Sequence, residues 1–192
     1  MKYLLMDTAT NIMYIALINN KKIEYKKTRI AKRDHSKYLI DYIQKLLEEA
    51  KVDLGSLDGI IVGEGPGSYT GLRIAGVVAK TFSYTKKIPL YKVSSLFLLT
   101  SGYQNVVAMI DARNDYVFGA IYHKNENIIK DNHFKKEELL KYANDEDIIM
   151  IDENNFKINA EKIINKMVLV DNPHSYIPNY INKTEAERNA NK

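Results

Sequence analysis

The chain of 192 residues contains no cysteine, so it can form neither a disulfide nor a thiolate metal site, and it has no thiol nucleophile. This absence favours the cytoplasm as its compartment. The sequence also lacks an apolar run of 18 residues, and we therefore predict that no helix crosses a membrane. We expect no signal peptide, because Asp7 interrupts the first apolar run and the following pattern alternates as in a strand.

Histidine is scarce and scattered. The four histidines are His35, His123, His133 and His174, and no two of them form an HxxxH or HExxH pair. A catalytic metal requires clustered ligands. The sequence therefore predicts no metal site and no metal-dependent catalysis in this chain.

Carboxylates are missing between Gly65 and Ile110, where the charged residues are one arginine and four lysines. Residues 1–110 carry 16 basic and 9 acidic groups, whereas residues 111–192 carry 12 and 15. This asymmetry has two explanations. The loops are simply solvated and rich in lysine, or the first half of the chain is a basic surface that binds RNA or an acidic partner. Charge by itself does not choose between the two interpretations.

The first half of the chain is predicted to form three strands followed by alternating helices and strands. Apolar alternation predicts strands at residues 2–6, 12–18 and 22–28, and the apolar run GIIVG predicts a buried strand at 59–63. Asp34 or Ser36 can cap a helix whose apolar residues recur at helical spacing up to Ala50. A helix at 70–85, a strand at 90–93 and a short helix from Ser94 complete the order βββαβαβα.

The second half repeats this order. The segment VVAMIDARNDYVFGAIY aligns with KYLLMDTATNIMYIALI at an offset of 104 residues, with Asp111 beneath Asp7. The further predicted elements are a strand near 127–130, a helix near 135–142, a strand at 148–151, a helix near 156–166 and a strand at 167–170. We predict a first lobe of residues 1–103 and a smaller second lobe of residues 104–192 that packs on it.

Two such lobes indicate an α/β fold of the duplicated ribonuclease-H-like type, with mixed sheets flanked by helices, as in actin, sugar kinases and Hsp70-type ATPases. In those proteins, glycine-containing turns after the first strand of each lobe admit nucleotide phosphates. The corresponding turns here, DTATN and DARND, contain no glycine. The sequence therefore predicts a degraded nucleotide site.

Four of the nine glycines lie in the segment GEGPGSYTGLR, residues 63–73. The segment fits no Walker loop, because no lysine follows a glycine, and no GxGxxG fingerprint, because Ser68 or Thr70 stands at the third glycine position. It predicts a sharp turn from a buried strand into a helix that Ser68 or Thr70 caps. An anion bound at the helix N-terminus near Arg73 is the alternative.

The helix that follows has a face with almost no side chains. Gly71, Ala75 and Ala79 recur at four-residue intervals, and Gly76 lies beside them. Such a face lets another helix or a sheet approach closely. Further apolar residues on this helix and on the preceding one exceed what a single buried face needs. Core packing and a protein–protein surface both account for this surplus.

Asp7 and Asp111 lie at strand ends where related folds place an acid that orients a metal ion or water. One hypothesis is therefore a small-molecule kinase or ATPase that uses both carboxylates across a cleft. The missing glycines, together with local hydrogen bonds expected from Thr8 and Thr10 to Asp7, favour a structural role instead.

The segment GEGPGSYTGLRIAGVVAK resembles the GPGSFTGLRIG signature of the TsaB family, also called YeaZ, which acts in the synthesis of threonylcarbamoyladenosine (t6A) on tRNA. LLMDTAT is similar to the opening strand of that family, RDHSKYLIDYI to its RxHS helix, MIDARNDYVFGAIY to its DAR segment and PNYINKTEAE to its closing YLR-x-x-AE segment. Tyr69 stands where phenylalanine is usual, Ala75 where glycine is common and Asn182 where arginine is usual.

The resemblance implies a non-catalytic subunit that binds no cofactor alone and pairs with the related enzyme TsaD, with the P-loop ATPase TsaE joining them. TsaD, with its metal ion and ATP or ADP, would transfer threonylcarbamoyl to N6 of adenosine 37 in tRNAs reading ANN codons, so this chain would meet tRNA through the complex. It also implies a homodimer of the isolated chain. The predicted partner contacts are Tyr38, Leu39, Tyr42, Ile43, Leu46, Leu72, Ala75, Gly76 and Ala79. The signature turn comprises Gly65, Pro66, Gly67, Ser68, Tyr69, Thr70, Gly71 and Arg73.

Overall fold

The computed structural model describes residues 1–30 and 34–181. In these residues one sheet has the strand order β10-β5-β4-β1-β2-β3. Its strands are β1 (Lys2–Asp7), β2 (Ile12–Asn19), β3 (Lys22–Ile30), β4 (Gly59–Gly63), β5 (Leu90–Val93) and β10 (Val168–Leu169). The pairs β1–β2 and β2–β3 are antiparallel, whereas β1–β4 and β4–β5 are parallel. The first sheet is therefore mixed, as predicted.

A second sheet has the order β8-β7-β6-β9. Its strands are β6 (Asn105–Asp111), β7 (Tyr116–His123), β8 (Glu126–Lys135) and β9 (Asp147–Met150). The helices are α1 (His35–Ala50), α2 (Tyr69–Lys86), α3 (Ser95–Thr100), α4 (Lys136–Leu140) and α5 (Ala160–Lys166). Like the first sheet, the second sheet pairs its first two strands antiparallel, and it pairs its first strand parallel with the strand that follows the first helix, β9.

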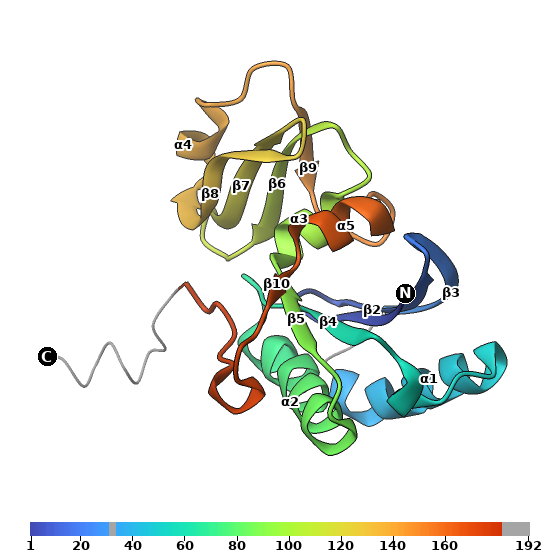
Figure 1. The fold of residues 1–192 in the computed structure, drawn as a ribbon. Helices are drawn as coiled ribbons and strands as arrows, with labels where there is room; N and C mark the ends of the chain where they lie inside the picture. The colour runs from blue at the N-terminus through green and yellow to red at the C-terminus, as the bar shows by residue number, and fades with distance from the viewer. Residues whose placement is uncertain (31–33, 182–192) are drawn as a thin grey trace, which may run out of the picture.

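Helices and sheets alternate in layers, which Figure 1 shows from α1 and α2 at the bottom to the second sheet at the top. One apolar cluster joins α1 and α2 to the first sheet through residues such as Leu39 and Met6. A second cluster lies between the two sheets and includes Leu96 of α3 and Ile163 of α5. A third, smaller cluster joins the second sheet to α4 through Leu139. Because the middle cluster takes residues from both sheets, the two lobes share a core.

The predicted element order is confirmed through both lobes, and β4 and β5 have the predicted bounds. The predicted helix at 156–166 is shorter, because the backbone before it is held against the end of α3. The N–H of Lys157 donates to the carbonyl of Leu99 (2.8 Å), and the N–H of Asn159 donates to Ser101 Oγ (2.7 Å). The side chain of Asn159 then caps α5 by accepting from the N–H of Lys162 (3.1 Å).

Asp34 stands at the N-cap position of α1, as one of the two predictions had it, but its side chain does not cap the helix. Both carboxylate oxygens instead accept hydrogen bonds from the guanidinium of Arg29 at 2.6 Å. Such a two-point contact between Arg29 and Asp34 fixes the end of β3 to the start of α1.

The last described segment returns to the first lobe, so residues 168–181 depart from the predicted second lobe of residues 104–192. Strand β10 pairs antiparallel with β5 in the first sheet. Residues 170–181, here called the C-terminal strap, then run beside α2 (Figure 1). Tyr176 of the strap is 5% exposed and belongs to the cluster between α2 and the first sheet. Asn182, the departure from the family pattern, lies outside the described residues.

The predicted equivalence of Asp111 and Asp7 is wrong by one residue. In the first hairpin Asp7 pairs with Tyr14, and in the second Ile110 pairs with Phe118, the residue aligned with Tyr14. Ile110 therefore holds the ladder position of Asp7. Successive side chains of a strand point to opposite faces of the sheet. A shift of one residue therefore places Asp111 on the opposite face of its sheet from the one that the alignment with Asp7 predicts. Asp7 is fully buried, whereas Asp111 is exposed.

Candidate functional site

Hydrogen bonds attach the glycine-rich turn to the end of β1. Ser95 Oγ donates to Asp7 Oδ2 (2.5 Å), and the N–H of Ala9 donates to Asp7 Oδ1 (2.9 Å). Ser95 also holds the turn, because its Oγ accepts from the N–H of Gly65 (3.0 Å) and its own N–H donates to the carbonyl of Gly65 (2.8 Å). One serine thus links the carboxylate of β1 to the turn that leads into α2.

Asp7 fills the space between the ends of β1 and β4. Its side chain is 0% exposed, and burial raises its pKa to about 6, although the hydrogen bonds from Ser95 and Ala9 lower it. Gly63 makes room for this carboxylate, because a Cβ on Gly63 would lie 1.8 Å from Asp7 Oδ2. This position inside the fold agrees with a structural role for Asp7.

The hydrogen bonds predicted from Thr8 and Thr10 to Asp7 are not formed. Thr8 Oγ1 donates instead to the carbonyl of Gly71 (2.6 Å), and Thr10 Oγ1 accepts from the N–H of Ile12 (3.0 Å). The carbonyl of Thr8 lies so near Gly71 that a Cβ there would be 1.9 Å away. The turn after β1 therefore packs directly on the first turn of α2.

Ser68 caps α2, which confirms one of the two predicted caps. Its Oγ accepts from the N–H of Gly71 (3.2 Å), and its own N–H donates to the carbonyl of Ala9 (2.7 Å). Gly65 has φ +104°, a left-handed value that favours glycine. The signature turn is thus held by backbone and hydroxyl groups of the chain itself.

A cleft of about 520 Å³ lies between the lobes. Thr10, His35 and Ser68 line it from the first lobe, and Asp111 and Arg113 line it from the second. Asp7 does not reach this cleft, so the two carboxylates of the kinase hypothesis do not face each other across it. Residues of the DTATN and DARND turns line it instead.

The small-residue face of α2 is covered by the protein itself. Ala75 and Ala79 are 0% exposed in the cluster with the first sheet, and Gly71 receives the backbone of Thr8. A Cβ on Gly76 would lie 3.1 Å from the ring of Tyr176 in the C-terminal strap. Close packing explains these small residues, as predicted, but the packing is intramolecular.

The predicted partner-contact residues differ in how far they are buried. Tyr38 and Tyr42 are partly exposed, and the Arg29 guanidinium lies 4.0 Å from the centre of the Tyr38 ring. The other seven are buried in the folded chain: Leu39, Ile43, Leu46, Leu72, Ala75, Gly76 and Ala79. These seven residues face the protein's own sheet, α1–α2 contact or strap, although Leu39 and Ile43 still line hollows between α1 and α2. Their role as partner contacts stays a prediction.

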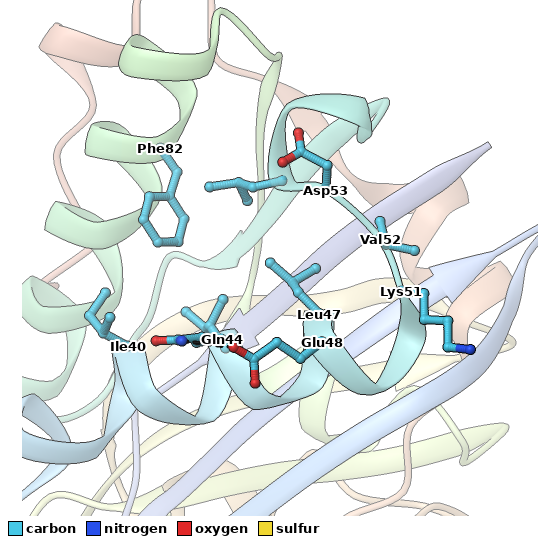
Figure 2. Close-up of a pocket in the computed structure, with 10 residues that line it drawn as sticks. Ile40, Gln44, Leu47, Glu48, Lys51, Val52, Asp53 and Phe82 are labelled. Atoms are coloured by element: carbon cyan, nitrogen blue, oxygen red, sulfur yellow. Dashed lines mark hydrogen bonds between the residues drawn. The ribbon is translucent and has the colours of Figure 1, made fainter.

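Other apolar residues of the same two helices reach the surface. Ile40 is 48% exposed and Val77 62%, and both line a hollow of about 450 Å³ between α1 and α2. Ile40 also borders a second hollow of about 380 Å³, where Leu47 of α1 and Phe82 of α2 face each other across an open space (Figure 2). We call these two joined hollows the α1–α2 groove. The sequence signal for it was the apolar surplus outside the four-residue stripe.

One end of the groove meets the signature turn and the strap. Tyr69 lines both the groove and the cleft between the lobes. Its ring centre lies 4.6 Å from that of Tyr180 in the strap and 4.1 Å from the guanidinium of Arg73. Arg73 also donates to the hydroxyl groups of both tyrosines. Tyr69 and Arg73 in the first turns of α2 are thereby linked to Tyr180, close to the last residue that the structure describes.

In the described residues, no group of three or more His, Cys, Asp or Glu side chains is arranged to hold a metal ion. Over the same ranges, no helix combines the length and the apolar character needed to span a membrane.

Comparisons with known proteins agree on one family. The family model described as TsaD, tRNA N6-adenosine threonylcarbamoyltransferase, matches residues 18–190. The tRNA threonylcarbamoyladenosine biosynthesis protein TsaB of Escherichia coli K12 is 30% identical over 133 residues, covering 66% of this chain and 57% of that protein. TsaB of Bacillus subtilis 168 is 32% identical over 126 residues, covering 64% and 55%. The chain thus spans little more than half the length of these curated relatives.

Solved structures show the same fold. A Pseudomonas aeruginosa protein described as similar to peptidase YEAZ superposes with a TM-score of 0.75 at 22% identity, over 94% of this chain and 99% of that chain. YeaZ from Pseudomonas aeruginosa superposes with a TM-score of 0.72, also at 22% identity, over 93% and 99%.

Proposed function

Because this chain belongs to the TsaB (YeaZ) group of the family that the TsaD model describes, we propose that it is a non-catalytic subunit of a t6A-forming complex. In this role it binds a TsaD-type enzyme through the α1–α2 groove, and a TsaE-type ATPase joins the pair. The partner subunits hold ATP or ADP and the metal ion. Threonylcarbamoyl transfer to N6 of adenosine 37 in tRNAs reading ANN codons takes place on the TsaD-type enzyme.

The α1–α2 groove is the observation that supports this proposal most directly. Two adjacent helices present apolar side chains around joined hollows of about 450 and 380 Å³. Ile40 is 48% exposed and Val77 62% exposed there. Since neither side chain is needed to fill the hydrophobic core, an apolar residue at these positions suggests contact with a partner. A continuous apolar groove between helices is typical of a surface that receives a partner's helix.

The arrangement of Asp7 supports the non-catalytic part of the proposal. A carboxylate that accepts two internal hydrogen bonds at 0% exposure has no direct access to a substrate in the cleft. The cleft itself is lined by side chains at the turns where related enzymes use glycine. The chain is therefore suited to stabilise an active partner rather than to bind nucleotide itself.

Two substitutions test whether the α1–α2 groove binds the partner, and neither of them alters a buried residue. Ile40→Asp and Val77→Asp each place a charge in the α1–α2 groove, and we expect either to weaken binding of the purified TsaD-type enzyme about tenfold or more. Ile148→Asp is the matched control, because Ile148 is 55% exposed but lies on β9 of the second lobe. Thermal unfolding of all three variants checks that the fold is retained.

The pathway is tested by nucleoside analysis of tRNA after depletion of this protein. We expect t6A to fall, to recover with the unaltered chain and Ile148→Asp, and to stay low with Ile40→Asp. Normal t6A levels after depletion would contradict the role in t6A synthesis. Unchanged binding by both groove variants would contradict the α1–α2 groove as the binding site for the partner.

Calorimetry of the isolated chain with ATP and Mg²⁺ separates this proposal from the kinase hypothesis. We expect no binding heat, because the cleft lacks the glycine turns that admit phosphates. Micromolar affinity would instead favour an enzyme of the same fold.

A further inference from the structure

The exposed face of α2 continues past the α1–α2 groove onto the C-terminal strap. Val77 and Tyr84 of α2 and the Pro173–His174 turn of the strap line a hollow of about 260 Å³. Tyr84 is 64% exposed, and its ring centre lies 4.5 Å from that of His174 in an edge-on arrangement. Because Val77 borders both this strap hollow and the α1–α2 groove, the two form one surface that crosses α2.

The strap turn is held in place before any partner arrives. Lys80 Nζ donates to the carbonyls of His174 (2.7 Å) and Tyr176 (3.3 Å). The side chain of Asn172 accepts from the N–H of His174 (2.9 Å), and the Tyr176 ring is buried against Gly76. Docking on a surface that is already ordered avoids the entropy cost of ordering it.

Charge indicates the chemistry of the occupant. Helix α2 carries Arg73, Lys80 and Lys86 but no carboxylate, and Lys87 follows it directly. Lys87 is exposed and lines a neighbouring hollow together with Tyr84 and Pro173, whereas the side chain of Lys86 lies beside Gly55. A partner surface with carboxylates complements this helix, whereas a second copy docked symmetrically over the same hollow would bring two cationic α2 helices together.

We propose that the strap turn is a third element of the docking surface, beside α1 and α2. On this view, which rests on the proposed function, the strap hollow takes an apolar side chain of the TsaD-type partner, and a carboxylate beside that side chain faces Lys87. Tyr84 and His174 act as the walls that determine which side chain fits. An aromatic residue that walls an interface pocket commonly carries a large share of the binding energy.

The test uses the full chain and the purified TsaD-type enzyme from the same organism. Tyr84→Ala and His174→Ala remove the walls of the strap hollow, and we expect the first to weaken binding about tenfold and the second several-fold. Tyr142→Ala is the matched control, since Tyr142 is 62% exposed on the second lobe, and it should leave affinity within about twofold. Thermal unfolding of each variant establishes that the fold is intact.

Charge reversal tests the chemistry of the occupant. Lys87→Glu should slow association several-fold at low salt, with a smaller effect at high salt. Equal rates for this variant and the unaltered chain would overturn the acidic character of the partner surface.

The outcomes separate this inference from the function on which it rests. Loss of binding with Ile40→Asp but not with Tyr84→Ala or His174→Ala would overturn the role of the strap and leave the docking function standing. Full binding by all of these variants would overturn both. If sedimentation shows a homodimer that Tyr84→Ala dissociates while partner binding is unchanged, the occupant is a second copy and the proposal is wrong.

Discussion

Replacing Asp7 with asparagine should alter how the stability of the protein depends on pH. Burial raises the pKa of Asp7 to about 6 in the folded chain, whereas an aspartate in an unfolded chain has a pKa of about 3.9. Between these values the folded state binds the proton more tightly than the unfolded state. The contribution of Asp7 to stability is therefore greatest below about pH 4, falls as the pH rises, and is lost above about pH 6.

The size of the effect follows from the difference between the two pKa values. The difference is about 2 pH units, and each unit corresponds to about 1.4 kcal/mol, so ionised Asp7 costs about 3 kcal/mol at pH 7 relative to pH 4. Asparagine has nearly the same shape and never ionises. Any change in the hydrogen bonds with Ser95 and Ala9 is independent of pH, so it shifts the whole curve without changing its slope.

Urea unfolding at intervals from pH 4 to pH 8 measures this difference. We expect Asp7→Asn to gain about 3 kcal/mol relative to the unaltered chain over that range, most of it between pH 4 and pH 6. Asp131, whose pKa burial also raises, contributes equally to both proteins and cancels in the difference. Asp111→Asn, which replaces the exposed carboxylate of the second lobe, is the control. Parallel curves for Asp7→Asn and the unaltered chain would refute the reasoning.

Three further substitutions test how the interior of the first lobe is packed. Tyr176→Phe should raise the free energy of unfolding by about 1 kcal/mol, because the buried hydroxyl of Tyr176 has no hydrogen-bond partner among the described residues; a loss of stability in urea unfolding would contradict this. Gly63→Ala should lower it by about 3 kcal/mol or more, because the new methyl group overlaps Asp7, and an unchanged midpoint would show that the strand ends can move. Ala79→Glu should unfold the chain, visible by circular dichroism, because it buries an unpaired carboxylate against the sheet; a folded variant would show that α2 can shift outward.

Local features of the sequence were enough to predict the element order. The strand GIIVG, the strand at Leu90–Val93 and the cap at Ser68 depend on residues that are neighbours in the chain. Alternation and capping act over a few residues, so the sequence shows them directly. The missing glycines of DTATN and DARND were equally visible, and the loss of a nucleotide site that they predict stays a prediction.

Contacts between segments that are distant in the chain could not be predicted from the sequence. Asp7 and Ser95 are 88 residues apart, and nothing near either residue indicates that they form a hydrogen bond. The partner of Gly76 is the Tyr176 ring of the strap, so the small-residue stripe predicted close packing without showing what packs there. A register shift of one residue in the second hairpin likewise leaves the composition of β6 unchanged while it turns Asp111 outward.

The sequence by itself determined a duplicated α/β fold, a glycine-rich turn into a small-faced helix, and apolar helices in excess of one core. Only the tertiary structure decided which side of those helices stays open. The strap and the first sheet cover the small residues of α2, and the surplus apolar residues Ile40, Val77 and Tyr84 remain at the surface. Periodicity defines the faces of a helix, but burial of each face depends on which distant segment packs against it.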